Sequence, residues 1–146
     1  MISTRGRYAL RVMLDLAQNL EKKNSSVKDI AARQQISAKY LESVIAILNK
    51  AGLVVSKMGK NGGYHLAKKP EEYCIGDILR LTEGRLVPVN CLQCCDNPCE
   101  RAKDCITLPM WRELGKIVNH YLDHLTLKDL LEGNVAVSPI DKVGDR

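Results

Sequence analysis

The fold is decided by residues 26–48, which read SVKDIAARQQISAKYLESVIAIL. Ser26 is a good N-cap residue, and the apolar spacing after it predicts a short helix over residues 27–34. A tight turn follows, and Ser37 suits the cap of a second helix. The apolar face of that second helix is Leu41, Val44, Ile45 and Leu48. A short helix, a turn and a second amphipathic helix are typical of a helix-turn-helix.

The flanking segments extend this motif into a winged helix-turn-helix. The apolar spacing before it predicts a first helix over residues 4–20, with Leu20 on its apolar stripe. After it, two extended runs at residues 53–56 and 64–67 flank Asn61-Gly62, a strong signal for a hairpin turn. This hairpin carries glycine and lysine at its tip, as a wing does.

The second half of the chain predicts a longer helix beyond a loop. A short helix ends at Gly84, and the following segment has no helical or strand period, so we expect a long loop. A helix from Pro109 to about Leu125 then carries apolar residues at heptad-like spacing. The expected parts of this mainly α chain are a winged helix-turn-helix domain (1–84), a cysteine-rich loop (85–106), a dimerisation helix with a closing short helix (107–133) and a disordered tail (134–146).

The charge of the chain is divided unevenly. The 146 residues carry a net charge of +5. Residues 1–70 hold 13 Lys and Arg against 4 Asp and Glu, a net charge of +9, whereas residues 71–146 hold 9 against 13, a net charge of −4. A basic half joined to an acidic half is typical of a nucleic-acid-binding unit with a second task elsewhere.

The second helix of a helix-turn-helix places its N-terminal residues against base edges in the major groove of DNA. Lys39 can neutralise a phosphate or read guanine, and Glu42 can accept a hydrogen bond from cytosine. The predicted DNA-contacting residues of this helix are Ser37, Ala38, Lys39, Tyr40 and Glu42. Further phosphate contacts are expected from the wing and the first helix, at Lys57, Lys60, Arg5 and Arg7.

Five of the six cysteines fall between Cys91 and Cys105. Structural disulfides are rare in the cytosol, so the cluster indicates metal binding or redox chemistry. Zinc sites usually use two tight cysteine pairs separated by a folded spacer, whereas this single loop has unequal spacings that favour an iron–sulfur cluster. A thiol redox switch and a zinc site stay open as alternatives. Cys74, outside the loop, is expected to be a small buried residue.

Four segments together resemble the family of repressors that includes the iron–sulfur regulator IscR, the nitric-oxide sensor NsrR and the cysteine-metabolism regulator CymR. They are residues 3–9, 36–42, 62–64 and 105–114. The resemblance spans about residues 1–133 and implies a homodimer whose two recognition helices read a palindromic operator. In IscR-like members three loop cysteines hold a [2Fe-2S] cluster, and Cys99 and Cys105 match the last two of them.

The chain departs from the family pattern at three positions. The family spacing would place the third loop cysteine at Gln93, the histidine ligand of IscR is replaced by Leu108, and the common wing arginine is replaced by Met58. The expected cluster ligands are Cys91, Cys95, Cys99 and Cys105, with Cys94 as an alternative to Cys91 or Cys95.

We therefore expect a cytoplasmic transcription regulator, acting as a repressor, whose DNA binding is controlled by an oxygen-labile [2Fe-2S] cluster. The alternative is a thiol-redox or cysteine-metabolism regulator of the same fold without a cluster. The sequence contains neither a phosphate-binding loop nor a nucleophile–base motif, so we do not expect an enzyme. The opening residues lack a signal peptide, and no apolar run approaches the roughly 18 residues that a membrane helix needs.

Overall fold

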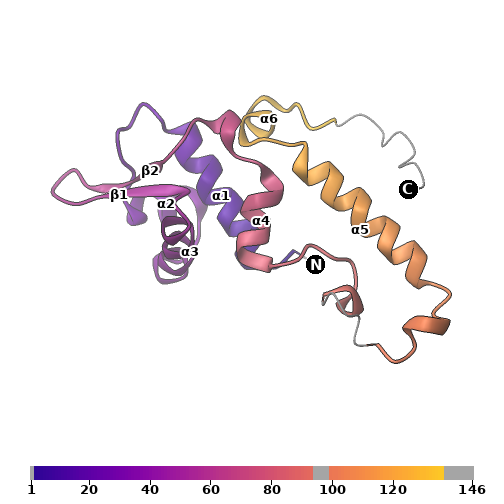
Figure 1. Ribbon diagram of the computed structural model, residues 1–146. Helices are drawn as coiled ribbons and strands as arrows, with labels where there is room; N and C mark the ends of the chain where they lie inside the picture. Colours follow the sequence, from indigo (N-terminus) through magenta and orange to yellow (C-terminus); the bar gives the residue numbers. More distant parts are fainter. Residues whose placement is uncertain (1, 94–98, 137–146) are drawn as a thin grey trace.

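The structure is a computed structural model that describes residues 2–93 and 99–136. The helices of this described part are α1 (Thr4–Gln18), α2 (Val27–Gln34), α3 (Ala38–Lys50), α4 (Ile75–Glu83), α5 (Leu108–Asp123) and α6 (Leu127–Glu132). Strands β1 (Val54–Lys57) and β2 (Gly63–Leu66) form an antiparallel pair (Figure 1). The predicted mainly helical fold with a hairpin wing is confirmed.

Serine and threonine caps begin four of these helices. The side chains of Ser3, Ser26, Ser37 and Thr126 each accept a hydrogen bond from a backbone N–H of the first turn of α1, α2, α3 and α6. Because four backbone N–H groups at a helix start lack helical partners, such caps fix where a helix begins. The starts of α2 and α3 therefore agree with the sequence-based prediction.

The core forms around α1, which packs against α2, α3, α4, α6 and β2. Its fully buried members include Ala9, Val12, Met13, Ile30, Leu41, Val44, Leu48, Leu79 and Leu127. The predicted extension of the first helix to Leu20 is wrong: α1 ends at Gln18, and Leu20 is 54% exposed. The amide of Asn19 donates to the backbone carbonyl of Asp15 at 2.7 Å, a hydrogen bond that closes the last turn.

The wing is a hairpin whose strands lie one residue from their predicted positions. Lys57 pairs with Gly63, so the five residues 58–62 connect the strands, where the predicted runs 53–56 and 64–67 left seven between them. The register is fixed from outside the hairpin, because two backbone hydrogen bonds of 2.8 and 2.9 Å join Tyr64 to Ser25 in the loop between α1 and α2. Gly63 has φ +148°, and a Cβ there would lie 2.5 Å from the Ser25 carbonyl oxygen, so this close approach requires glycine.

The second half extends away from this core and then returns to it. The predicted loop over residues 85–106 is not irregular throughout, because it includes short 3₁₀ turns at Asn90–Leu92 and Ala102–Asp104. Helix α5 begins at Leu108, one residue before Pro109, and its N-terminal end lies far from the wing (Figure 1). Helix α6 then packs against α1, with Leu127 fully buried.

No helix in residues 2–93 or 99–136 is long and apolar enough to cross a membrane. The last ten residues of the predicted tail, 137–146, lie outside the described residues.

Candidate nucleic-acid interface and cysteine segment

The N-terminal turn of α3 presents polar side chains to solvent. Ser37, Ala38, Lys39 and Glu42 are exposed and Tyr40 is half-buried. The opposite face of α3 is buried against α1 and α4 through Leu41, Val44, Ile45 and Leu48. The amphipathic spacing of α3 therefore points Lys39 and Glu42 away from the core, whereas Tyr40 packs against the edge of the core.

Aromatic and cationic side chains lock this turn to the start of α1. The Tyr8 and Tyr40 rings meet edge to face, with centroids 5.4 Å apart and an interplanar angle of 87°. The guanidinium of Arg11 lies 5.4 Å from the Tyr8 ring centroid, and it donates to the side chain and backbone of Gln34 at the end of α2. These interactions fix the first turn of α3 relative to α1 and α2.

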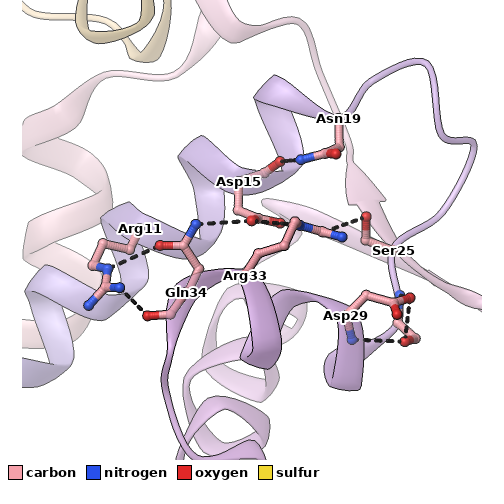
Figure 2. Close-up of polar contacts among 8 residues, drawn as sticks. Arg11, Asp15, Asn19, Ser25, Asp29, Arg33 and Gln34 are labelled. Carbon is pink, nitrogen blue, oxygen red and sulfur yellow. Dashed lines mark hydrogen bonds and ion pairs between the residues drawn. The ribbon is translucent and has the colours of Figure 1, made fainter.

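A buried carboxylate connects α1 to α2 and to the loop that contacts the wing (Figure 2). The Asp15 residue is 1% exposed, and its carboxylate accepts hydrogen bonds from Arg33 at 2.6 and 3.0 Å and from Gln34 at 3.0 Å. Arg33 also donates to Ser25 at 3.1 Å. The Asp15 hydrogen bond raises the pKa of the Arg33 guanidinium, which therefore stays charged. The network joins the helix-turn-helix to the wing through Ser25.

The remaining predicted phosphate contacts lie on the wing and on α1. Lys57 ends β1, Lys60 lies in the wing loop, and both line one cavity beside the start of α2. Arg5 and Arg7 are exposed in the first turn of α1, where Arg7 donates to Thr4 at 3.0 Å. The wing residue at the position of the family's arginine, Met58, is 94% exposed.

Two of the predicted cluster ligands share a cavity. Cys99 and Cys105 both line a space of about 370 Å³ formed within residues 99–107. The Sγ of Cys105 lies 3.4 Å from the Thr107 hydroxyl, and this hydrogen bond, with the nearby positive charge of Arg101, lowers the pKa of the Cys105 thiol. These two neighbours therefore increase the share of Cys105 present as thiolate, the form that binds iron or reacts with oxidants.

The other cysteines are placed differently. Cys91 is half-buried on the 3₁₀ turn Asn90–Leu92, and Cys94 and Cys95 lie outside the described residues. Among the described residues, no three or more side chains of Cys, His, Asp or Glu are grouped as a metal site. Cys74 is half-buried at the N-cap of α4, where its thiol contacts the backbone carbonyl of Leu122.

Sequence reasoning missed several residues of this region. Arg11 and Gln34 are ordinary polar residues in the sequence, and only the packing of α1 on α2 brings them together. Asp15 carries a signal, since it interrupts the apolar run from Val12 to Ala17, and a buried acid requires a partner. Lys22 and Lys23 line the same cavity as Lys57, but no sequence pattern marks them.

The helical core around α1, the helix-turn-helix and the β-hairpin beside it define the class of the protein, a winged helix-turn-helix. A family model named Rrf2, described as an iron-dependent transcriptional regulator, matches residues 2–133. The chain belongs to this family of transcriptional regulators, and membership of the family implies DNA binding.

The similar proteins cover most of the chain. Protein rrf2 of Nitratidesulfovibrio vulgaris is 42% identical over 131 residues, which are 89% of this chain and 86% of that protein. The HTH-type transcriptional regulator IscR of Aliivibrio salmonicida is 33% identical over 145 residues, 99% of this chain and 83% of that one.

Two solved structures share both fold and sequence with the chain. T. potens IscR is 38% identical with a TM-score of 0.73, over 92% of this chain and 88% of that one. CymR, the global cysteine regulator of B. subtilis, is also 38% identical, with a TM-score of 0.72, over 91% of this chain and 97% of that one.

Proposed function

We propose that the chain is a cytoplasmic repressor that binds a palindromic operator as a homodimer, under the control of an iron–sulfur cluster. The observation that carries the DNA-binding part is the exposed polar turn at the start of α3, held in place by the Tyr8–Tyr40 contact and the Arg11–Gln34 hydrogen bonds. Lys39 supplies a phosphate or guanine contact, and Glu42 selects a base.

Two substitutions test the exposed N-terminal turn of α3, residues 37–42, which we call the recognition turn. Lys39→Ala is expected to weaken binding to all duplexes and to make the salt dependence shallower by about 0.9 for each phosphate that is no longer neutralised. Glu42→Ala is expected to relax selectivity at one base position by about 1–3 kcal/mol. Lys50→Ala, at the other end of α3, is the matched control. Unchanged affinity and selectivity in both variants would refute this assignment of the recognition turn.

The homodimer rests on an apolar face of α5. Its exposed apolar residues are Met110 (54%), Leu114 (39%), Ile117 (45%), Val118 (36%) and Tyr121 (40%). Exposing such an apolar stripe to water is unfavourable for a monomer, whereas the α5 helix of a second copy would bury it. Leu114→Glu is expected to give a monomer in sedimentation velocity, while Lys116→Glu, on the same helix, stays dimeric. A dimeric Leu114→Glu variant would contradict this interface.

The cluster would be held by Cys91, Cys95, Cys99 and Cys105, with Cys94 as the alternative to Cys91 or Cys95. Two observations support it: Cys99 and Cys105 line one cavity, and Thr107 and Arg101 favour the thiolate of Cys105. Leu108, at the position of the family's histidine, is 5% exposed and has no ligand atom, which favours an all-thiolate site. The cluster supplies a redox- and oxygen-sensitive group whose occupancy alters DNA binding.

Anaerobic purification tests the cluster directly. The wild-type chain should be coloured and contain iron and acid-labile sulfide, and Cys99→Ala and Cys105→Ala should lose both. Cys74→Ala, whose thiol lies against α5 and away from the cavity, should keep them. A colourless chain after anaerobic reconstitution, with unaltered DNA binding, would rule out the cluster and leave the DNA-binding proposal intact.

Thiol sensing is the second candidate, favoured by the lowered pKa of Cys105 and by the similarity to CymR. Mild oxidation of the cluster-free chain should then join two cysteines of the segment from Cys91 to Cys105, and this disulfide should change DNA affinity. Peptide mass spectrometry identifies the pair. If a disulfide forms with no change in affinity, thiol sensing is excluded.

A further inference from the structure

A basic groove lies between the α1–α2 loop and the wing. It has a volume of about 670 Å³ and is lined by Lys22 and Lys23 from the loop and by Lys57 and Lys60 from the wing. All four lysines are exposed, and no ion pair in the described part of the chain involves them. We call these four residues the lysine groove.

The two walls of the lysine groove are joined by hydrogen bonds. The side-chain amide of Asn24 donates to the Asn61 carbonyl in the wing loop at 3.0 Å, and its oxygen lies 3.0 Å from Nδ1 of His65 in β2. The backbone of Ser25 pairs with that of Tyr64 immediately beside them. The loop lysines therefore keep a fixed position relative to the wing lysines, even though all four side chains lie in solvent.

The charge of the groove selects an anionic partner with more than one negative group. Four lysines face one carboxylate, that of Asp29. This carboxylate already accepts hydrogen bonds from the hydroxyl of Ser26 at 2.7 Å and from its backbone N–H at 3.4 Å, in the capping box of α2. The positive end of the α2 dipole lies at the same place and adds to the field of the lysines. A row of phosphates matches this arrangement better than a single small anion.

We propose that Lys22 and Lys23 extend the DNA interface, so that the lysine groove holds the phosphate backbone of the duplex beyond the wing. This inference rests on the proposed DNA binding, because it is the wing that would bring the backbone to the groove. Met58, where the family has an arginine, carries no charge, and the loop lysines supply positive charge on the adjacent side of the wing. Lys22 and Lys23 then contribute affinity and length of contact but no base selectivity.

The double variant K22Q/K23Q tests the groove. The probe is a 40-base-pair duplex selected from a random-sequence library by the wild-type full-length chain, with binding followed by fluorescence anisotropy between 50 and 300 mM KCl. Without these two lysine–phosphate interactions, the slope of log K against log salt should be shallower by about 1.8 per bound protomer. Hydroxyl-radical footprinting should show weaker protection at the outer edges of the site only.

A matched control separates a local contact from a general reduction of charge. The variant K116Q/K128Q removes the same charge from α5 and α6 and should keep the wild-type slope and footprint. On a duplex trimmed to the selected motif, K22Q/K23Q and wild type should bind alike. The proposed role of the lysine groove would be refuted if the two double variants gave equal slopes of log K against log salt. It would also be refuted if K22Q/K23Q weakened binding to the trimmed duplex as much as binding to the full duplex. If the wild type selects and binds no duplex at all, the proposed function itself fails.

Discussion

Replacing Asp15 by asparagine removes one charge from the most buried polar group of the described chain. The asparagine has almost the same size, so packing is preserved and only charge and hydrogen bonding change. The carboxylate accepts from Arg33 through both oxygens and from Gln34 through one. An asparagine keeps one acceptor oxygen and turns an N–H₂ group toward the donors of Arg33 or Gln34.

The expected loss of stability follows from the burial of Asp15 and of its partner Arg33. Breaking a buried ion pair by removing one partner costs about 3–5 kcal/mol. Asp15 is 2% exposed at its side chain but Arg33 is 29% exposed, so water partly solvates the arginine that is left behind. We expect Asp15→Asn to lower the free energy of unfolding by about 3 kcal/mol. In a chain of this size that corresponds to a fall in Tm of about 6–12 °C.

Urea unfolding followed by circular dichroism measures this effect. Glu113→Gln is the control, because its partner Lys116 lies 3.2 Å away on the surface of α5 and exposed pairs contribute about 0–1 kcal/mol. The double variant D15L/R33M should recover about half of the loss, since an apolar pair leaves no buried charge. A loss below about 1 kcal/mol in Asp15→Asn would refute the argument that this network holds α2 to α1.

Three further perturbations test the wing, the start of α2 and a buried hydroxyl. Gly63→Ala should cost about 2 kcal/mol or more in urea unfolding, because its Cβ meets backbone, whereas Gly59→Ala at the open loop tip should cost less. Hydrogen bonds from Ser26 lower the pKa of Asp29, so the unfolded chain protonates first and stability falls as the pH drops below about 4. Asp29→Asn should flatten that acid loss, measured as urea midpoints between pH 3 and 6; an equally steep loss would contradict the assignment. Tyr73→Phe should cost about 2 kcal/mol by thermal melting, because the buried hydroxyl bridges two backbone groups at 2.7 and 2.8 Å; an unchanged Tm would show that water replaces it.

Most of the helices were predictable because their determinants are local. The capping serines Ser26 and Ser37 and the apolar spacing of Leu41 to Leu48 lie within a few residues of the structure they specify. The two strands of the wing were each misplaced by one residue, because their register depends on the pairing of Tyr64 with Ser25, 39 residues earlier in the chain. The end of α1 was misplaced because Leu20 fits the apolar period, yet the helix ends at Gln18 and leaves Leu20 54% exposed.

The candidate sites also differ in whether their determinants are local in the sequence. The recognition turn follows from the position of Ser37, and the shared cavity of Cys99 and Cys105 follows from their closeness in sequence. The lysine groove could not be predicted in this way, because Lys22 and Lys57 line one cavity only after the loop between α1 and α2 pairs with the wing. The lowered pKa of Cys105 likewise depends on the orientation of the Thr107 hydroxyl, which no sequence spacing specifies.

The outlying end of α5 also gives the molecule a built-in optical reporter. Trp111 is the only tryptophan in the chain, and its backbone N–H donates to the carbonyl of Thr107, whose hydroxyl contacts the Cys105 sulfur. Trp111 lies in the N-terminal turn of α5 and is not a member of the hydrophobic core around α1, so its emission reports on that end of α5. Intrinsic fluorescence thus observes one end of α5, whereas far-ultraviolet dichroism observes the helices as a whole, and a ligand-induced change confined to the cysteine segment and this turn would alter the first signal while the second stays constant.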